Sequence, residues 1–417
     1  MFKIFCTLLF LFLPIVAEAQ FVRHNSLSVR SAQVELNGEW GEVPVIVLGG
    51  DDILFFSFDE MSHEYRRYTY RITHCNSDWT PSELLEIDYL DGFNGVPIED
   101  WENSVNTTQL YTRYEFQLPN SNTSLKLSGN YKVDIMDEES STETPVLTFL
   151  FSVMEPRVKI SAAISGDTDR SLNEGEQQLS FAVDFSRYPI SSPESEIKPV
   201  IYQNRRFDNA VYGIKPLYIT AGRVEYAHDA RLIFDAGNEY RRFEYTDPDS
   251  PGMNVEETVY DGERYHAVLY MDSPRRSHSN YRDENGRYFI NTTRGYGSPL
   301  EADYVFVHFA IEMPYRGGGD FYLLGDLCDN GFGTMNRLEY DAESGYYHTS
   351  LFLKLGLYNY MYAWLPDNCN AIEISQAEGN FYDTDNEYLI YIYHRAFGER
   401  YDRLVGVHKS NYVLEKN

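Results

Sequence analysis

Two neighbouring side chains, His74 and Cys75, suggest chemistry because an imidazole can activate a thiol for nucleophilic attack. Both lie in the stretch 68–75, whose alternation is typical of a β-strand. Successive side chains of a strand point to opposite faces, so these two cannot hydrogen-bond to each other. A base would have to come from elsewhere in the fold, and no motif identifies one. The pair does not predict a cysteine enzyme.

Other groups of ligand and acid–base residues are incomplete. Asp383, Asp385 and Glu387 resemble half of a calcium loop, but Tyr388 stands where that loop requires glycine. The 64 Asp and Glu residues are too many for any pair to indicate glycoside hydrolysis. No glycine loop for phosphate and no zinc-protease helix is present. The sequence therefore predicts a non-enzymatic protein without a cofactor, a metal or a small-molecule ligand.

The segment 74–93, HCNSDWTPSELLEIDYLDGF, has neither strand nor helix periodicity and mixes aromatic residues with acids. Irregular segments of this composition are typical of surfaces that bind a partner. We expect four anchors and three rim acids there: Trp79, Tyr89, Leu90 and Phe93, with Asp78, Asp88 and Asp91. The alternative is that the loop folds back on its own domain, with Trp79 in the core.

The elements that must position this segment are short strands. The ranges 45–48 and 53–58 predict one hairpin, and 346–353 with 357–365 predict another. Regular short strands and frequent turns, without a long helix, predict an all-β fold of tandem immunoglobulin-like β-sandwich domains. Glu155-Pro156 interrupts the strand pattern, so the predicted domains are 20–155, 156–299 and 300–417.

The first 19 residues have the three regions of a secretory signal peptide: Lys3, the apolar run 4–16, and a cleavage site that ends at Ala19. The mature chain is expected to begin at Gln20. An oxidising compartment permits a disulfide between Cys328 and Cys369, and two buried thiols are the alternative.

Charge and hydropathy narrow the classes of partner. The net charge is −29, which repels phosphate backbones and anionic membranes, so nucleic acid is not an expected partner. No apolar run after the signal peptide reaches the roughly 18 residues that a membrane helix needs. We therefore expect a secreted protein without direct membrane insertion.

The signal peptide and five long motifs together resemble the plug protein family of the bacterial type IX secretion system. The motifs, in chain order, are HCNSDWTPSELLEIDYLDGFN, IYQNRRFDNA, ADYVFVHF, GDFYLLGDL and RYDRLVGV, and the likeness runs from about Gln20 to Val407. The resemblance implies a periplasmic protein that binds the SprA-type outer-membrane translocon barrel. It also implies that the protein seals the barrel's periplasmic opening when no cargo is present.

The last predicted domain also resembles early-set, glycogen-binding immunoglobulin-like modules, through the ranges 320–325 and 357–362. Those modules carry a tryptophan a few residues after Gly325, and this chain has none there. Trp364 could stack on a sugar alone, which leaves a carbohydrate-binding protein as the alternative function. A hydrolase assembled from scattered residues is a third hypothesis, without a nucleophile motif to support it.

Overall fold

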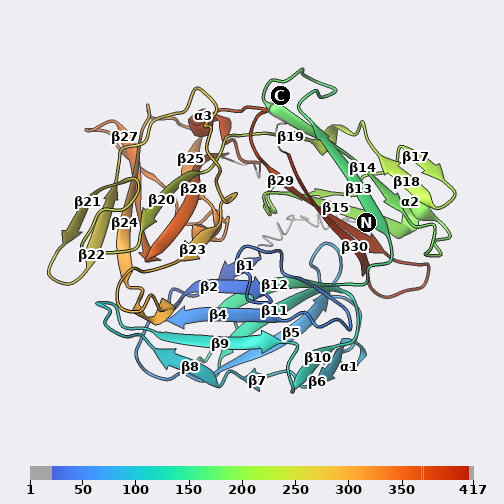
Figure 1. The fold of residues 1–417 in the computed structure, drawn as a ribbon, viewed down its shortest axis with the longest axis horizontal. Helices are drawn as coiled ribbons and strands as arrows, with labels where there is room; N and C mark the ends of the chain where they lie inside the picture. The colour runs from blue at the N-terminus through green and yellow to red at the C-terminus, as the bar shows by residue number, and fades with distance from the viewer. Residues whose placement is uncertain (1–20, 368, 370, 413–417) are drawn as a thin grey trace, which may run out of the picture.

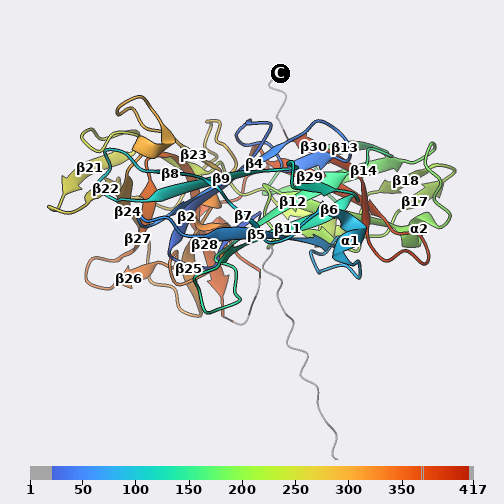
Figure 2. The same cartoon turned by 90° about the horizontal axis from the view of Figure 1, so that it is seen from below.

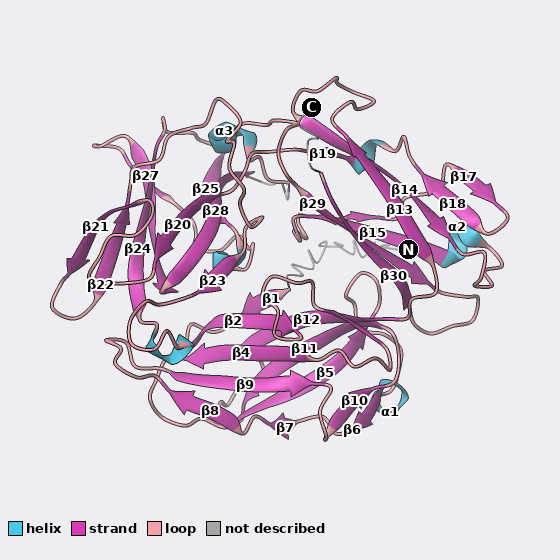
Figure 3. Ribbon diagram, in the orientation of Figure 1, coloured by secondary structure: helices cyan, strands magenta, loops and turns pink. Residues whose placement is uncertain are grey.

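Strands form almost all of the regular structure in the computed structural model, which describes residues 21–367, 369 and 371–412 (Figure 3). The alternation in β5 (Tyr68–Cys75) illustrates why: Tyr68, Tyr70, Ile72 and His74 are all buried, on one face. The predicted all-β sandwich fold is confirmed. No helix within the described ranges is long and apolar enough to cross a bilayer. The predicted signal peptide and Cys6 lie outside these ranges.

The N-terminal unit is a sandwich of two sheets with a two-stranded ribbon beside it. One sheet has the order β1-β12-β11-β5-β7, with β3 beside β12; its other strands are β1 (Val22–His24), β3 (Val45–Val47), β7 (Val96–Pro97), β11 (Gly129–Asp137) and β12 (Leu147–Met154). The facing sheet has the order β2-β4-β9-β8, namely β2 (Val29–Leu36), β4 (Leu54–Glu60), β9 (Thr112–Leu118) and β8 (Asp100–Asn103). The ribbon pairs β6 (Leu90–Gly92) with β10 (Thr123–Leu125), and the one-turn helix α1 (Glu86–Tyr89) precedes it.

The middle unit takes its strands from two separate parts of the chain. One sheet is β13-β14-β18-β17 with β19 beside β14: β13 (Lys159–Ser165), β14 (Glu176–Asp184), β17 (Tyr218–Thr220), β18 (Arg223–Tyr226) and β19 (Ile233–Asp235). The other is β16-β15-β29-β30: β15 (Ile197–Gln203), β16 (Val211–Tyr212), β29 (Glu387–His394) and β30 (Arg403–Asn411). Short helices α2 (Pro193–Glu196) and η1 (Ala230–Leu232) join these strands.

The inserted unit lies between β19 and β29 in the chain. Its first sheet groups β20 (Arg241–Tyr245), β23 (Tyr288–Ile290) and β25 (Gly319–Leu324) around β28 (Gly356–Pro366). Its second sheet has the order β21-β22-β24-β27-β26: β21 (Val255–Tyr260), β22 (Tyr265–Leu269), β24 (Tyr304–Glu312), β26 (Glu339–Asp341) and β27 (Tyr346–Lys354). The helices are η2 (Pro299–Glu301), η3 (Asp326–Cys328) and α3 (Ser375–Glu378).

The predicted boundary between residues 299 and 300 is wrong. Strands β20 to β23 share sheets and a core with β24 to β28, while β29 and β30 pair with β15 in the middle unit. The middle unit is therefore interrupted by the inserted unit. The physical reason is that pairing between β15 and β29 joins residues almost 200 positions apart, which no local pattern can signal.

Both predicted hairpins are also wrong. Strand β3 pairs in parallel with β12, whereas β4 pairs with β2 and β9 in the facing sheet. Likewise β27 pairs with β24, and β28 with β20, so these consecutive strands lie in opposite sheets. In each case the chain reverses where the turn residues predict it, but the strands pack face to face.

The predicted disulfide is not formed. Cys328 and Cys369 are both free thiols. The sulfur of Cys328 donates to the carbonyl oxygens of Leu323 and Gly325, each at 3.2 Å. Cys369 is exposed and Cys328 is only partly buried, so the alternative of two buried thiols is wrong as well.

The three units lie side by side in one flat layer, with the N-terminal unit below the other two in Figure 1 and the thin dimension vertical in Figure 2. Polar contacts fix their junctions. The Lys354 ammonium of the inserted unit lies 2.6 Å from the Asp59 carboxylate of the N-terminal unit, and both side chains are fully buried. At the meeting point of all three units, the carbonyl oxygen of Gly41 accepts hydrogen bonds from Arg205 and Arg287.

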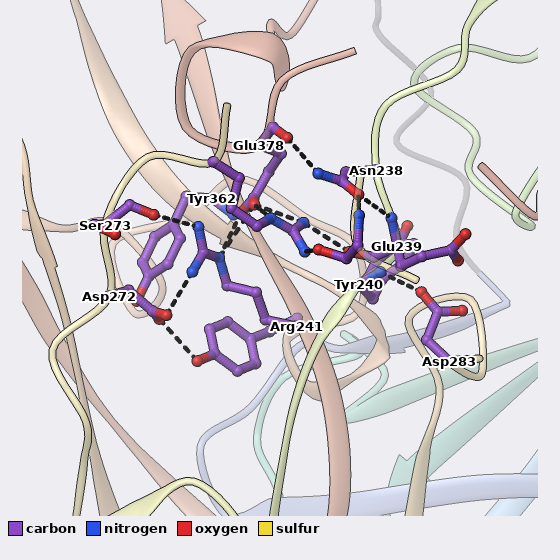
Figure 4. A network of polar contacts seen from close by, with 12 residues as sticks. Asn238, Glu239, Tyr240, Arg241, Asp272, Ser273, Asp283, Tyr362 and Glu378 are labelled. Carbon is purple, nitrogen blue, oxygen red and sulfur yellow. Dashed lines mark hydrogen bonds and ion pairs between the residues drawn. The ribbon is translucent and has the colours of Figure 1, made fainter. Parts of the chain in front are cut away.

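A buried ionic network lies where the linkers of the inserted unit cross (Figure 4). The Arg241 guanidinium lies between Glu378 of α3, at 3.1 Å, and Asp272, at 2.5 Å. Arg275 contacts the same Glu378 carboxylate at 2.7 Å. The side chain of Asp283 accepts a hydrogen bond from the backbone of Tyr240 nearby. Here two arginines pair with two carboxylates at the end of the inserted unit that joins the middle unit, which we call the base of the inserted unit.

Candidate partner-binding surface

The segment 74–93 begins as a strand and turns back over the edge of the N-terminal unit. His74 is the last inward-facing residue of β5, and a tight turn over Asn76–Thr80 follows. Burial lowers the pKa of His74 to about 4, so its imidazole is neutral. Its two nitrogens contact the Ser82 hydroxyl at 3.0 Å and the Ser128 carbonyl at 3.1 Å. His74 therefore holds the turn in place.

Cys75 is fully buried, and burial raises the pKa of its thiol to about 12. A nucleophilic cysteine must be a thiolate at neutral pH, and an apolar environment opposes that. Cys75 thus packs as a small apolar residue. Across the described residues, no group of three His, Cys, Asp or Glu side chains has the geometry to hold a metal ion.

The structure separates the seven predicted contact residues into two groups. Trp79, Tyr89 and Leu90 are buried, at 5%, 7% and 4% exposure. Tyr89 and Leu90 belong to the core of the N-terminal unit, and the Tyr89 hydroxyl donates to the carbonyl oxygen of Ile72. These two residues anchor the segment to its own unit.

Trp79 connects two units. Its indole nitrogen donates to the Tyr202 hydroxyl of the middle unit at 3.1 Å, and its ring packs against Phe207, with ring centres 6.0 Å apart. Its backbone φ is 64°, a left-handed conformation that is rare for a bulky residue. The contact with the middle unit offsets the cost of that conformation. Trp79 is thus buried, as the alternative expects, but it packs against the middle unit and is not part of the core of its own unit.

The second group is open to solvent. Phe93 is 76% exposed, and Asp78 and Asp91 are exposed beside the same segment. Asp88 accepts a hydrogen bond from the backbone of Leu85 and forms an ion pair with Arg400 of the middle unit at 3.0 Å. The hydrogen bond, together with the ion pair, lowers the pKa of Asp88. The acids thus rim the segment, and one of them ties it to the neighbouring unit.

Two further exposed apolar residues are not among those predicted from the sequence. Leu85 is 67% exposed and Ile87 is 75% exposed, on the outer side of α1 (Figure 2 shows where this helix lies). The signal was available: a single helical turn has one inward face, and Leu84 and Tyr89 already occupy it. We call Leu85, Ile87 and Phe93 the exposed apolar set.

A further exposed aromatic ring lies on the middle unit, in a loop next to this segment. Phe397 is fully exposed in the loop between β29 and β30, three residues before Arg400. Because Arg400 contacts Asp88, this loop borders the α1 segment. Exposed apolar residues that gather on one side with charged neighbours are typical of protein interaction sites.

The comparisons with known proteins agree with the fold and point to one family. The model for the Type 9 secretion system plug protein 1st domain matches residues 29–155. A hypothetical protein from Parabacteroides merdae, known from its crystal structure, superimposes with a TM-score of 0.91 and 38% sequence identity. That comparison covers 94% of this chain and 99% of the other. None of the curated proteins compared with the chain matches it.

Proposed function

Because the chain belongs to the type IX secretion system plug protein family, we propose that it closes the outer-membrane translocon of that system. The protein binds the periplasmic opening of the SprA-type barrel and seals it while no cargo is in transit. This role consists of binding and occlusion. In this proposal the signal peptide directs export and is cleaved after Ala19. The mature protein then stays at the outer membrane because it binds its partner there.

Two physical properties support a sealing role. A seal must keep its shape, and buried polar contacts such as Lys354–Asp59 and Trp79–Tyr202 hold the three units in one layer. A seal must also be released, which favours a few strong contacts over a large apolar face. The net charge of −29 would complement a basic surface on the partner and opposes binding to nucleic acid.

We propose that the exposed apolar set, Leu85, Ile87 and Phe93, contacts the barrel. These residues lie in the unit that matches the plug-domain model. Three large apolar side chains, each at least two-thirds exposed, are costly to leave in water and gain free energy when a partner covers them. Glu83, Glu86 and Asp91 are exposed in the same segment and would steer a basic partner surface towards it.

The test is capture of the barrel from detergent-solubilised outer membranes, with mass spectrometry of what binds. The tagged protein is expected to retain one very large barrel protein. Replacing the exposed apolar set with serine is expected to weaken capture at least about tenfold, since interface anchors each contribute about 1–2 kcal/mol. The melting curve should stay unchanged, because these side chains are exposed.

A matched control replaces Tyr296 and Tyr315 of the inserted unit with serine, since both are also highly exposed. This variant should capture the barrel as the parent does. Asp91→Lys should weaken capture through charge alone and is preferred to Asp88→Lys, because Asp88 also holds Leu85 and Arg400. Equal capture by the parent and the serine variant would remove this surface from the interface.

The structure gives no support to carbohydrate binding. Trp364, the expected sugar platform, is only 1% exposed. Its ring packs against Phe321, with centres 4.8 Å apart, and the Arg316 guanidinium covers it at 4.5 Å. A sugar ring cannot stack on a face that is already covered. Trp364 belongs to the core of the inserted unit, so the hypothesis that it stacks on a sugar alone is wrong.

A further inference from the structure

Four polar side chains form an unbroken chain of contacts on the outer face of the inserted unit. Ser350 Oγ lies 2.7 Å from His308 Nδ1, His308 Nε2 lies 2.9 Å from His266 Nδ1, and His266 Nε2 lies 3.1 Å from Asp261 Oδ2. The residues come from β27, β24, β22 and the turn before β22. His308 and Ser350 stand directly opposite each other across the antiparallel pair. The sheet itself therefore fixes the pair.

The terminal carboxylate determines where every proton lies. A carboxylate only accepts hydrogen bonds, so the Nε2 of His266 must carry a hydrogen. In the tautomer with its single hydrogen on Nε2, His266 accepts at Nδ1, and the Nε2 of His308 is then the donor. The Nδ1 of His308 is left as an acceptor, and the Ser350 hydroxyl donates to it. This order matches an oriented base that faces a hydroxyl nucleophile.

The charge states needed for such a base are present at neutral pH. Two backbone N–H groups, from Arg264 and Glu263, and the contact with His266 hold the pKa of Asp261 down at about 2, so it stays ionised. Burial is the main cause that lowers the pKa of His308, which favours its neutral form. A neutral imidazole can take a proton, and the imidazolium that results is stabilised through His266 by the Asp261 charge.

Ser350 is exposed and lines a groove of about 740 Å³ between the N-terminal and inserted units. Phe306 and Phe352 line that groove, with ring centres 4.7 Å apart; the His266 ring stacks on Phe306, and the Arg264 guanidinium lies over the Phe352 ring at 5.2 Å. Arg30 enters from β2; its guanidinium lies over the Phe352 ring at 5.6 Å and donates to the Phe352 carbonyl oxygen. Within the described ranges, Arg30 has no carboxylate at ion-pair distance, so its charge is available to a ligand.

We propose that Ser350 is an activated nucleophile that cleaves carboxylic esters with an apolar acyl group. His308 is its general base, and His266 and Asp261 are positioning residues. The acyl group lies against Phe306 and Phe352, and Arg30 stabilises negative charge that develops on the carbonyl oxygen. No sequence motif marks this site, because its members come from three separate stretches of the chain: 261–266, the strand with His308 and the strand with Ser350. The inference is independent of the sealing role.

The reaction balances without a cofactor. Ser350 Oγ bonds to the carbonyl carbon while its proton moves to His308 Nδ1. The bond from that carbon to the alcohol oxygen then breaks, and the alcohol leaves with the proton from His308. A water molecule gives a proton to His308 and its oxygen bonds to the acyl carbon. The acid leaves, and Ser350 recovers its hydrogen.

The test treats the purified whole protein with a fluorophosphonate probe, which bonds to an activated serine as fluoride leaves. Peptide mass spectrometry is expected to find the probe on Ser350. The purified protein should also release p-nitrophenol from a short-chain p-nitrophenyl ester. His308→Gln is expected to slow both reactions at least about 100-fold, the usual contribution of a general base. Asp261→Asn should change the pH at which labelling reaches half its maximum, which a purely structural residue would not do.

Ser344→Ala is the matched control, because Ser344 is an exposed serine in the turn just before β27. It should label as the parent does, whereas Ser350→Ala should not label at all; both variants should keep the parent's melting curve. Equal probe uptake by the parent and Ser350→Ala would overturn the inference. So would an unchanged labelling rate in a folded His308→Gln variant.

Discussion

At the scale of single residues, burial decides which members of the segment 74–93 can meet a partner. Trp79 and Phe93 are both large aromatic residues in the same irregular segment, and nothing local distinguishes them. Trp79 is covered because the middle unit presents Tyr202 and Phe207 to it. Phe93 directly follows β6 and is 76% exposed.

Trp79 should accordingly act on stability rather than on binding. Trp79→Ala is expected to lower the free energy of unfolding by about 3–5 kcal/mol, the usual cost of removing a large buried ring. Trp79→Phe keeps the ring and removes the hydrogen bond to Tyr202, which should cost about 1 kcal/mol. Urea unfolding measures both changes. A folded Trp79→Phe protein that no longer captures the barrel would show that Trp79 is a partner contact after all.

At the scale of elements, the sequence predicts strands better than it predicts their partners. The inward face of β5 and the boundary region at Glu155-Pro156 follow from side-chain alternation and proline, which act locally. The hairpins at 45–58 and 346–365 fail because a turn motif fixes a reversal of the chain without fixing which sheet each strand joins. The exposed Leu85 and Ile87 could be foreseen from the single turn of α1, whereas the Ser350 site depends on pairing of β22, β24 and β27.

The short helix α3 gives a prediction at this scale. Its Glu378 is fully buried and contacts both Arg241 and Arg275, so it connects α3 to β20 and to the loop after β22. Glu378→Gln would leave two guanidinium groups short of a counter-charge, and we expect a loss of about 3–5 kcal/mol of unfolding free energy. Chemical denaturation measures it.

The control for that prediction is Glu225→Gln, because the Glu225–Arg223 pair is about half exposed on both sides. Exposed pairs contribute between 0 and about 1 kcal/mol, so this change should be nearly neutral. If both variants unfolded at the same denaturant concentration as the parent, the network in Figure 4 would not stabilise the base of the inserted unit.

At the scale of the whole molecule, insertion of one unit into another concentrates buried charge where the two linkers cross. Glu239 lies on the outgoing linker, Asp385 on the returning one, and Asp283 in a loop of the inserted unit. Burial raises the pKa of Glu239 to about 7, and burial with repulsion from Glu239 raises that of Asp283 to about 7. Burial also raises the pKa of Asp385. Three carboxyl groups therefore share one poorly solvated site.

Several neighbours modulate this site. His278 Nε2 lies 3.0 Å from Glu239 Oε1, and the backbone N–H of Asp385 donates to the same oxygen at 3.0 Å. Arg275 opposes the rise in the pKa of Glu239, and Arg282 that of Asp385. These cations and donors reduce the repulsion but do not cancel it, since the pKa of Glu239 and of Asp283 still lies near 7.

The folded protein thus holds protons on Glu239 and Asp283 more tightly than the unfolded chain does. Their contribution to stability is fully present below the unfolded pKa of about 4 and is lost as pH rises through about 7.

The double variant Glu239→Gln with Asp283→Asn replaces both carboxyl groups with uncharged amides of the same shape. Compared with it, the parent should lose at least about 2 kcal/mol of unfolding free energy between pH 5 and pH 8. Urea unfolding at both pH values measures this loss. Glu225→Gln, which removes an exposed carboxylate, should lose the same unfolding free energy between these pH values as the parent. If the unfolding free energies of the parent and the double variant changed with pH in the same way, these two carboxyl groups would ionise without a cost in stability. The linker crossing would then not be the place where pH affects the stability of the fold.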